Sequence, residues 1–323
     1  MQKKYNVAIY GAGYEYNKIA HIINAHRDII NVVAIITTDE PQYNIVDGIK
    51  CCSVKNLDRD ICIDYYIIAI KDFRNPVMVL RKQGITDDKI ILSKALLFPC
   101  FDFKRYLNVK NSRVSILANY CMGGIIYDEL GMEMLSPTIL MSSPGPSFLK
   151  ILENPKEYLK REMVPYIDNN GIQEDLYGRY SHGLEMFTPK GFIKDTDIVW
   201  YFNHSADVLE TVKKWNIRRE RVNFDNLAVI MTIFTDEEAY RFEKLNISKK
   251  IGFYYKDLGL KSVLYLPGWE SEVTRSEYGF NWPMFVNRKV TGHWDGVEVV
   301  DWLRFLNGED DYIRFRSDVI NRE

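Results

Sequence analysis

The sequence predicts an α/β protein made of a Rossmann-like parallel-sheet N-terminal domain followed by a second three-layer α/β domain. Short apolar runs alternate with amphipathic helical segments, and a strand, a glycine turn and a helix open the chain. The length of 323 residues is enough for roughly two separate cores. Strands that alternate with helices favour right-handed crossovers, and we therefore expect mainly parallel sheets.

Five strands are expected in the first domain. The opening strand leads directly into the glycine turn at residues 11–13, and helical apolar periodicity follows that turn. The strand at residues 65–70 is apolar almost throughout, which is typical of strands that helices cover on both faces. The expected strands are residues 5–10, 32–36, 50–54, 65–70 and 89–92, with a helix at 75–83 that ends at Gly84.

The glycine turn predicts a phosphate site at the start of the first helix. Gly11 and Gly13 would let a pyrophosphate approach the backbone, and Asp39 after the second strand would bind a ribose. However, Tyr16 stands where the dinucleotide fingerprint has its third glycine, and Asp39 comes late for a ribose carboxylate. We therefore expect a nucleotide or a nucleotide-sugar ahead of NAD, and the alternative is a scaffold that binds no ligand.

A connector after the first domain breaks this pattern and predicts domains at residues 1–110 and 111–323. Residues 155–194 are irregular and rich in Tyr, Gly, Pro and Asn, as expected of a lid or a wrapping loop. In the rest of the second domain, expected strands and helices alternate again. Strands are expected at residues 114–118, 138–141, 198–202, 227–234, 250–254 and 262–266, and helices at 123–130, from Pro144, from the cap Ser205 to Trp215, at 237–245 after a capping box that starts at Thr235, and at 295–306.

The first strand of the second domain runs into the candidate nucleophile, Cys121. Asn119 ends that strand, and Gly123 and Gly124 open the next helix. Unpaired backbone N–H groups at a helix N-terminus lower the pKa of a thiol and stabilise a bound anion. We therefore expect Cys121 to be the most reactive of the five cysteines, with Asn119 and the two glycines in substrate binding. The alternative is a small buried residue at a tight turn.

His204 is the expected partner of Cys121. It follows the strand that ends at Asn203, just as Cys121 follows the strand that ends at Asn119. If these strands are parallel neighbours, both side chains open onto the crevice where open α/β sheets bind ligands. A Cys-His pair would then supply an activated thiolate. The alternative is a histidine whose ring satisfies a backbone carbonyl.

A basic turn precedes the strand at residues 227–234. Arg218, Arg219 and Arg221 lie where Asn223 and Asp225 can organise them, and guanidinium groups pair with phosphate or carboxylate in a bidentate manner. We expect this turn to bind an anionic part of the substrate in the same crevice. The alternative is a solvated helix face.

Composition and charge exclude several classes of protein. Lys plus Arg number 42 against 44 Asp plus Glu, so the net charge of −2 creates no field that would gather nucleic acid. No apolar run approaches the ~20 residues that span a bilayer, and the start lacks the apolar region of a signal peptide. The five cysteines form no paired CxxC motif and predict no metal centre. We expect a cytoplasmic protein with reduced thiols.

Two resemblances add a biological context. The strand-GxG-helix start and the run Tyr66-Ile-Ile-Ala-Ile70 make the first domain similar to the Rossmann-like N-terminal domains of bacterial sugar acyltransferases and other polysaccharide enzymes. The second resemblance rests on several motifs between residues 111 and 306. They are Asn119-x-Cys121-x-Gly123-Gly124-x-x-Tyr127-x-x-Leu130, Ser136-Pro137-Thr138, Tyr201-Phe202-Asn203-His204, Arg218-Arg219-x-Arg221-Val-Asn223-x-Asp225-Asn226 and Tyr265-Leu-Pro267. They resemble a bacterial family of unknown function whose members are often labelled exopolysaccharide or capsule biosynthesis proteins.

The resemblance implies a glycan context without an established reaction. The leading hypothesis is a transferase or sugar-modifying enzyme that acts at Cys121 and His204 on a small-molecule or glycan substrate. One alternative is a Cys-His hydrolase or acyltransferase in which Cys121 carries an acyl group. Another is a non-catalytic protein that binds a nucleotide-sugar. The sequence leaves the oligomeric state open.

Overall fold

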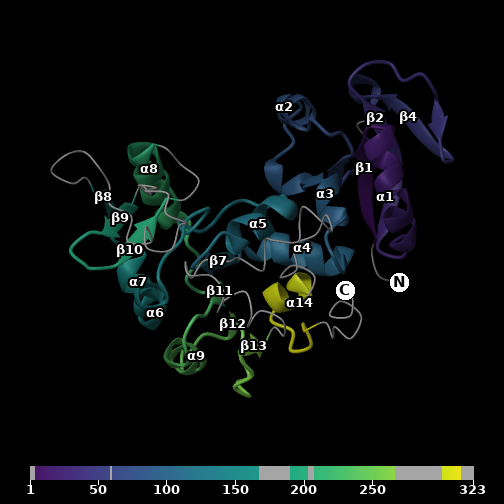
Figure 1. Cartoon of the computed structure of the whole chain (residues 1–323). Coiled ribbons are helices and arrows are strands. Elements are labelled where there is room, and N and C mark those ends of the chain that lie inside the picture. The colour runs from purple at the N-terminus through teal and green to yellow at the C-terminus, as the bar shows by residue number, and fades with distance from the viewer. Residues whose placement is uncertain (1–3, 59, 167–189, 203–206, 266–299, 314–323) are drawn as a thin grey trace, which may run out of the picture. The chain divides into compact units, whose positions relative to one another are not determined.

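The computed structural model describes residues 4–58, 60–166, 190–202, 207–265 and 300–313 (Figure 1). The chain divides into two compact units, of which the first comprises residues 1–111 and 128–132 and the second residues 112–127 and 133–323. Each unit contains a parallel sheet with helices, so the α/β class expected from the sequence is confirmed.

The first unit is built on a six-stranded sheet with the order β3-β4-β2-β1-β5-β6. Every neighbouring pair is parallel except the hairpin of β3 and β4. The five strands expected from the apolar runs are confirmed as β1, β2, β4, β5 and β6. The strands are β1 (Tyr5–Tyr10), β2 (Ile30–Thr37), β3 (Ile45–Val46), β4 (Ile49–Ser53), β5 (Tyr65–Ile68) and β6 (Ile90–Leu92).

The helices of the first unit bury one face each. In α1 the buried side chains Tyr16, Ile19 and Ile23 repeat at helical spacing. The expected connector at residues 103–112 is in fact a helix, because Phe103 and Tyr106 are buried in this unit. The elements are α1 (Tyr14–Ala25), α2 (Arg74–Lys82), α3 (Ser93–Leu96) and α4 (Phe103–Ser112), with short 3-10 helices η1 (Val54–Asn56) and η2 (Asp87–Lys89).

The second unit contains a four-stranded sheet with the order β13-β12-β11-β7, and all three pairings are parallel. Because the strands run the same way, their carboxyl ends share one edge of the sheet, and their amino ends share the other. The strands are β7 (Ser115–Ala118), β11 (Leu227–Thr232), β12 (Lys249–Tyr254) and β13 (Val263–Tyr265).

Local signals define most of the helices around this sheet. Thr235 caps α9 by accepting a hydrogen bond from the Glu238 backbone N–H, as the capping box predicts, and Gly308 ends α14 with a left-handed φ of 76°. The helices are α5 (Met122–Glu129), α6 (Gly145–Glu153), α7 (Pro155–Tyr158), α8 (Val208–Arg218), α9 (Asp236–Glu243) and α14 (Trp302–Asn307), with the 3-10 helix η3 (Arg219–Arg221).

Three expectations for the second unit are wrong. Residues 138–141 form no strand, and only an isolated bridge joins Ser142 to Tyr201. The helix α8 begins later than expected, with Asp207 as its N-cap in place of Ser205. The region 155–194 is not irregular throughout, because α7 and two strands of a separate antiparallel sheet lie within its described part. That sheet has the order β10-β9-β8 and consists of β8 (Met163–Pro165), β9 (Lys190–Ile193) and β10 (Val199–Tyr201).

Buried aromatic side chains join the antiparallel sheet to the main core of the second unit. The indole of Trp200 on β10 packs against Trp215 of α8 with ring centroids 5.4 Å apart, and against Phe148 of α6 at 6.1 Å. All three belong to one buried cluster that also contains side chains of the parallel sheet. This packing joins β10 to the core of the second unit in addition to its pairing with β9.

Candidate functional site

The carboxyl edge of the second sheet is the candidate site, because open α/β sheets bind ligands beyond the carboxyl ends of their strands. Three described segments meet this criterion. They follow β7 at residues 119–122, β11 at residues 233–236 and β12 at residues 255–257.

Asn119 has a structural role at this edge. Its amide nitrogen donates to the carbonyl of Thr232 and its amide oxygen accepts from the Thr232 backbone N–H, both at 2.9 Å. The side chain therefore continues the pairing of β7 with β11 where the strand ends. Its own carbonyl accepts from Ser143 N–H at 2.9 Å. This bonding accounts for a residue that the sequence assigned to substrate binding.

Cys121 lies in a different environment from the one expected. The residue is only 6% exposed, and burial raises the pKa of its thiol to about 12. The sequence predicted the opposite direction, since it placed the sulfur among open amides at a helix N-terminus. Desolvation penalises the thiolate and is the cause of this rise. The neutral thiol is therefore the form present at pH 7, while a catalytic role for Cys121 stays a prediction.

The two glycines after Cys121 serve close packing. A Cβ on Gly123 would lie 3.3 Å from the Cβ of Ala118 and from Ile116 Cγ2, and one on Gly124 would lie 3.2 Å from Ile139 Cγ2. Both distances are tighter than ordinary side-chain contacts. A side chain at Gly123 or Gly124 would therefore press against β7 or the neighbouring loop, and its neighbours would have to shift by a few tenths of an ångström.

His204 lies outside the described residues, so the proposed Cys-His pair stays a prediction. The reasoning that linked the two residues is nevertheless wrong, because β10 belongs to the antiparallel sheet and is not a parallel neighbour of β7. The described chain makes a different connection. Tyr201 exchanges two backbone hydrogen bonds with Ser142, and the next residue, Ser143, bonds to the carbonyl of Asn119.

Asp236, Tyr254 and Lys256 form a cluster at the carboxyl edge. Asp236 opens α9 after β11, and the other two residues come from the end of β12. The hydroxyl of Tyr254 donates to Asp236 Oδ1, and Lys256 Nζ donates to the same oxygen at 3.0 Å. Adjacent parallel strands therefore bring together a carboxylate, a phenol and an ammonium group.

The cluster combines a buried phenol with accessible charges. The hydrogen bond from Tyr254, followed by that from Lys256, lowers the pKa of Asp236. Burial and the bond to Asp236 raise the pKa of Tyr254, whereas the bond to Asp236 raises the pKa of Lys256. About half of the side-chain surface of Asp236 (49%) and of Lys256 (46%) is exposed. A ligand can therefore reach an ionised carboxylate beside a cation.

The sequence interpretation missed this cluster although a signal for it existed. Asp236 was assigned only to the capping box, and Tyr254 and Lys256 were assigned no role. Asp236 and Lys256 follow the carboxyl ends of expected strands and Tyr254 ends one, which is the same criterion that selected Cys121. What the sequence could not give was the adjacency of β11 and β12.

Glu238 is a second carboxylate beside this edge, but it is 8% exposed and caps α9. Its Oε2 accepts from the Phe234 backbone N–H at 2.9 Å. A Cβ on Gly145 would overlap this carboxylate, so any other residue at the start of α6 would displace the Glu238 side chain. Burial raises the pKa of Glu238 despite the backbone hydrogen bonds. We assign Glu238 to the structure of the edge rather than to ligand contact.

The basic turn does not share an edge with Cys121. The N–H of Asn223 donates to Ser115 Oγ at 2.8 Å, and Ser115 begins β7. The turn precedes β11, while Cys121 follows β7, so in a parallel sheet they lie at opposite edges. The single crevice expected from the sequence is therefore wrong for these residues.

The arginines of that turn have protein partners of their own. Arg219 donates to the carbonyl of Lys160 and pairs with Glu220 at 3.1 Å, and Arg221 lies 3.8 Å from Glu133. Burial lowers the pKa of Arg218. Asp225, by contrast, is 95% exposed in its side chain.

The two glycines of the turn in the first unit differ in conformation and in the space around them. Gly11 has a φ of 104°, and a Cβ there would lie 2.7 Å from Ile70 Cγ1, so the backbone requires this glycine. Gly13 precedes α1, and a Cβ there would meet no atom within 4 Å. Asp39 is exposed after β2, and Tyr16 is buried with its hydroxyl donating to Asp47 at 2.8 Å. Of these two glycines, Gly13 is the one with open space beside it.

Membrane-spanning helices and metal-binding clusters are both absent from the described residues. No helix there is both long and apolar enough to pass through a bilayer. In the same part of the chain, no three His, Cys, Asp or Glu side chains gather in a way that could hold a metal ion.

Two family models match the chain. The model described as "Domain of unknown function (DUF1919)" matches residues 92–304, which is more than half of the sequence and includes the whole described carboxyl edge of the second sheet. The model described as "C2185-like, N-terminal" matches residues 3–91.

Individual relatives add little to these matches. An uncharacterized protein of Haemophilus influenzae (strain ATCC 51907 / DSM 11121 / KW20 / Rd) is 25% identical over 166 residues, which cover 50% of this chain and 72% of the relative. Among solved structures, aspartate semialdehyde dehydrogenase II complexed with ASA from Vibrio cholerae aligns over 80% of this chain and 85% of its own. The sequence identity is 10% and the TM-score 0.25, at which the alignment carries no inference.

Proposed function

Since the chain belongs to the DUF1919 family, a family of unknown function, we propose from its site geometry that it is a glycosyl transferase of bacterial surface-glycan biosynthesis. The substrates would be an activated sugar phosphate, such as a nucleotide-sugar, and a glycan hydroxyl. The single observation that carries this proposal is the accessible carboxylate of Asp236, which Tyr254 and Lys256 hold at the carboxyl edge of the second sheet.

Sugar transfer needs a base and a cation, and this cluster supplies both. The acceptor oxygen forms a bond to the anomeric carbon, the bond from that carbon to the phosphate oxygen breaks, and the phosphate leaves with the electron pair. Asp236 would take the proton of the acceptor hydroxyl. Lys256 would stabilise the negative charge that develops on the leaving phosphate. Tyr254 would act as a positioning residue that orients the carboxylate.

We also propose that the first unit, taken by itself, binds a nucleotide or a nucleotide-sugar. Its support is the open space beside Gly13 at the start of α1, where a helix N-terminus favours a phosphate. NAD stays the weaker candidate because Tyr16 occupies the position of the third fingerprint glycine.

Conservative substitutions test the proposed base. With a panel of nucleotide-sugars as donors and a bacterial surface-glycan extract as acceptor, the wild type should release the nucleoside diphosphate from at least one donor. Asp236→Asn should then lower kcat about 10²-fold or more with little change in KM. Glu237→Gln is the matched control, because Glu237 is the next residue of α9 and is exposed. Wild-type turnover in Asp236→Asn, or no release from any donor, would reject the proposal.

A thiol mechanism makes a different prediction in the same assay. In a Cys-His hydrolase or acyltransferase, Cys121→Ser would abolish turnover, and mass spectrometry of the wild type would detect an acyl group on Cys121. In the proposed transferase, Cys121→Ser keeps most of the activity, because the buried neutral thiol does not take part. A non-catalytic nucleotide-sugar protein would bind a donor without consuming it.

A further inference from the structure

A cavity lies in the second unit, at the amino edge of the parallel sheet. Its volume is about 630 Å³, within the range of small-molecule sites. Leu227, which begins β11, and Ser248, which precedes β12, both line it. The cavity is therefore separate from the cluster of Asp236, Tyr254 and Lys256, which follows the carboxyl ends of the same strands.

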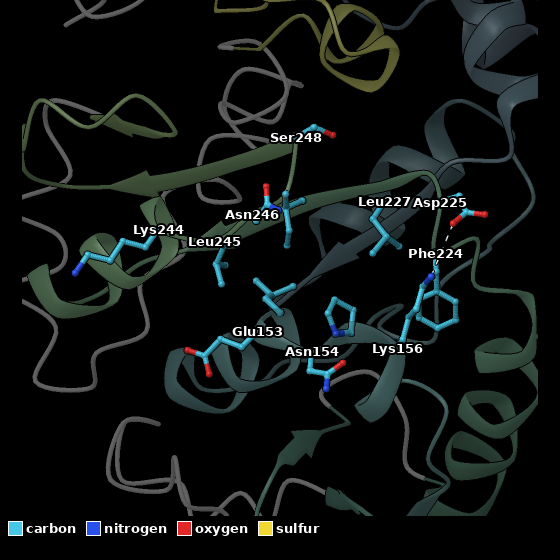
Figure 2. A pocket seen from close by; sticks show the side chains of 13 residues that line it. Glu153, Asn154, Lys156, Phe224, Asp225, Leu227, Lys244, Leu245, Asn246 and Ser248 are labelled. Atoms are coloured by element: carbon cyan, nitrogen blue, oxygen red, sulfur yellow. Dashed lines mark ion pairs between the residues drawn. The ribbon is translucent and has the colours of Figure 1, made fainter.

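The floor of this cavity is apolar. Leu152 of α6 is 2% exposed, and Phe224, Leu227, Leu245 and Ile247 are partly buried against the core of the unit. Figure 2 shows the side chains of Leu227 and Leu245 pointing toward the same space. Covering apolar carbon atoms at the base of an open cavity removes them from water, and this contributes favourably to the free energy of binding.

The rim is polar on all sides. Asn154 and Lys156 come from the end of α6 and the start of α7, Asp225 from the turn before β11, and Asn246 and Ser248 from the loop before β12. Figure 2 shows these residues around the apolar centre rather than at one end of it. Donors and acceptors therefore surround the floor.

The charges of the rim cancel. The lining residues include two carboxylates, those of Glu153 and Asp225, and two ammonium groups, those of Lys156 and Lys244. Lys156 lies 4.0 Å from Asp225, and Glu153 pairs with Arg241 of α9 at 2.8 Å. A strongly anionic ligand such as a polyphosphate would meet two carboxylates here. The rim therefore favours a ligand without a large net charge.

From these features we infer that the cavity binds a neutral saccharide. A sugar ring carries hydroxyl groups around its perimeter and C–H groups on its faces, which matches a polar rim around an apolar floor that includes the ring of Phe224. A molecule with a single polar head would need polar groups at one end only. This site goes beyond the proposed reaction and does not depend on it, since it would hold a glycan away from the carboxyl edge.

Binding to a glycan array tests this inference with the full chain. An array of neutral and anionic oligosaccharides should retain the labelled wild-type protein on neutral members. The double variant Asp225→Ala/Asn246→Ala removes two exposed rim groups, and Kd for the best array member should rise about tenfold or more. Asn24→Ala, an exposed asparagine of α1 in the other unit, is the matched control and should change Kd less than twofold.

The variant Asp236→Asn separates this inference from the proposed reaction, because it should bind the array like the wild type even when turnover is lost. Four results would overturn the inference: no retention on any glycan, retention on anionic glycans alone, an unchanged Kd in the double variant, or displacement of the glycan by leucyl-leucine, which would identify a groove for an apolar peptide.

Discussion

At the scale of single residues, burial decides what the ionisable groups can do. Cys121 and Asp236 both follow the carboxyl end of a parallel strand, yet their pKa values shift in opposite directions. The pKa of Cys121 is raised and that of Asp236 is lowered. Desolvation keeps Cys121 as a thiol, whereas hydrogen bonds from Tyr254 and Lys256 keep Asp236 ionised and partly exposed. For this reason our proposal gives the role of base to Asp236 and not to Cys121.

We expect Cys121 to react slowly with iodoacetamide. Alkylation follows the thiolate fraction, and with a pKa of about 12 that fraction is very small at pH 7 and rises toward pH 12. Cys62 is exposed and should be labelled earlier. Peptide mass spectrometry across pH 6 to 9 gives the order of labelling. Labelling of Cys121 before Cys62 would show that the thiol is accessible and activated, as the sequence alone predicted.

Gly11 and Gly13 should respond differently to alanine. Gly11→Ala is expected to lower the free energy of unfolding, because the Cβ would meet Ile70 at 2.7 Å and the φ of 104° disfavours any other residue. Gly13→Ala should leave stability within about 0.5 kcal/mol but weaken nucleotide-sugar binding. Urea unfolding and calorimetric titration measure the two effects. If Gly13→Ala bound nucleotide-sugars with the same affinity as the wild type, the alternative of a scaffold that binds no ligand would hold for the first unit.

At the scale of elements, α9 connects stability to the candidate site. Thr235 and Glu238 cap the helix whose first residue is Asp236. Thr235→Ala removes the side-chain acceptor for the Glu238 N–H, and we expect it to cost about 1 kcal/mol of stability. Urea unfolding measures this cost, and Thr86→Ala, a substitution at an N-cap without a side-chain bond, is the comparison. An equal cost in both variants would exclude capping as the cause.

The capping carboxylate also predicts a pH dependence. The pKa of Glu238 is raised in the fold from its ordinary 4.5, so the folded state holds its proton more tightly than the unfolded chain does. The contribution of Glu238 to stability is therefore greatest below pH 4.5 and declines as the pH rises through the folded-state value. In Glu238→Gln this decline should disappear. Urea unfolding from pH 4 to 8 checks it, and parallel profiles for both proteins would contradict it.

At the scale of the whole molecule, the first unit needs more chain than the family model of residues 3–91 covers. The helix α4 contributes Phe103, Tyr106 and Leu107, each at most 2% exposed, and Phe101 packs on Tyr106 with ring centroids 5.5 Å apart. The unit also takes in residues 128–132, where Leu130 accepts a hydrogen bond from the Tyr106 hydroxyl.

A fragment of residues 1–111 should therefore be more stable than one of residues 1–92. Each buried aromatic or leucine side chain is worth about 1.5–3 kcal/mol, so the shorter fragment should lose several kcal/mol. Circular dichroism during urea unfolding of both fragments measures the difference. Identical midpoints would show that α4 contributes nothing to this unit.

Element positions could be predicted because their signals are local. Apolar runs located all five parallel strands of the first sheet, and the Thr235 capping box located α9. Residues 138–141 show the limit, because a short apolar run beside Pro137 carries no information about whether another strand is available to pair with it.

The sequence by itself determined the α/β class, the order of most elements and the residues at the ends of the strands, since these depend on side-chain periodicity and capping within a few residues. Only the tertiary structure decided which residues share an edge. It placed β10 in an antiparallel sheet, put the Arg218–Arg221 turn at the opposite edge from Cys121, and brought Asp236 and Lys256 together across 20 positions. Strand order and burial arise from contacts between distant segments, and these contacts set both adjacency and pKa.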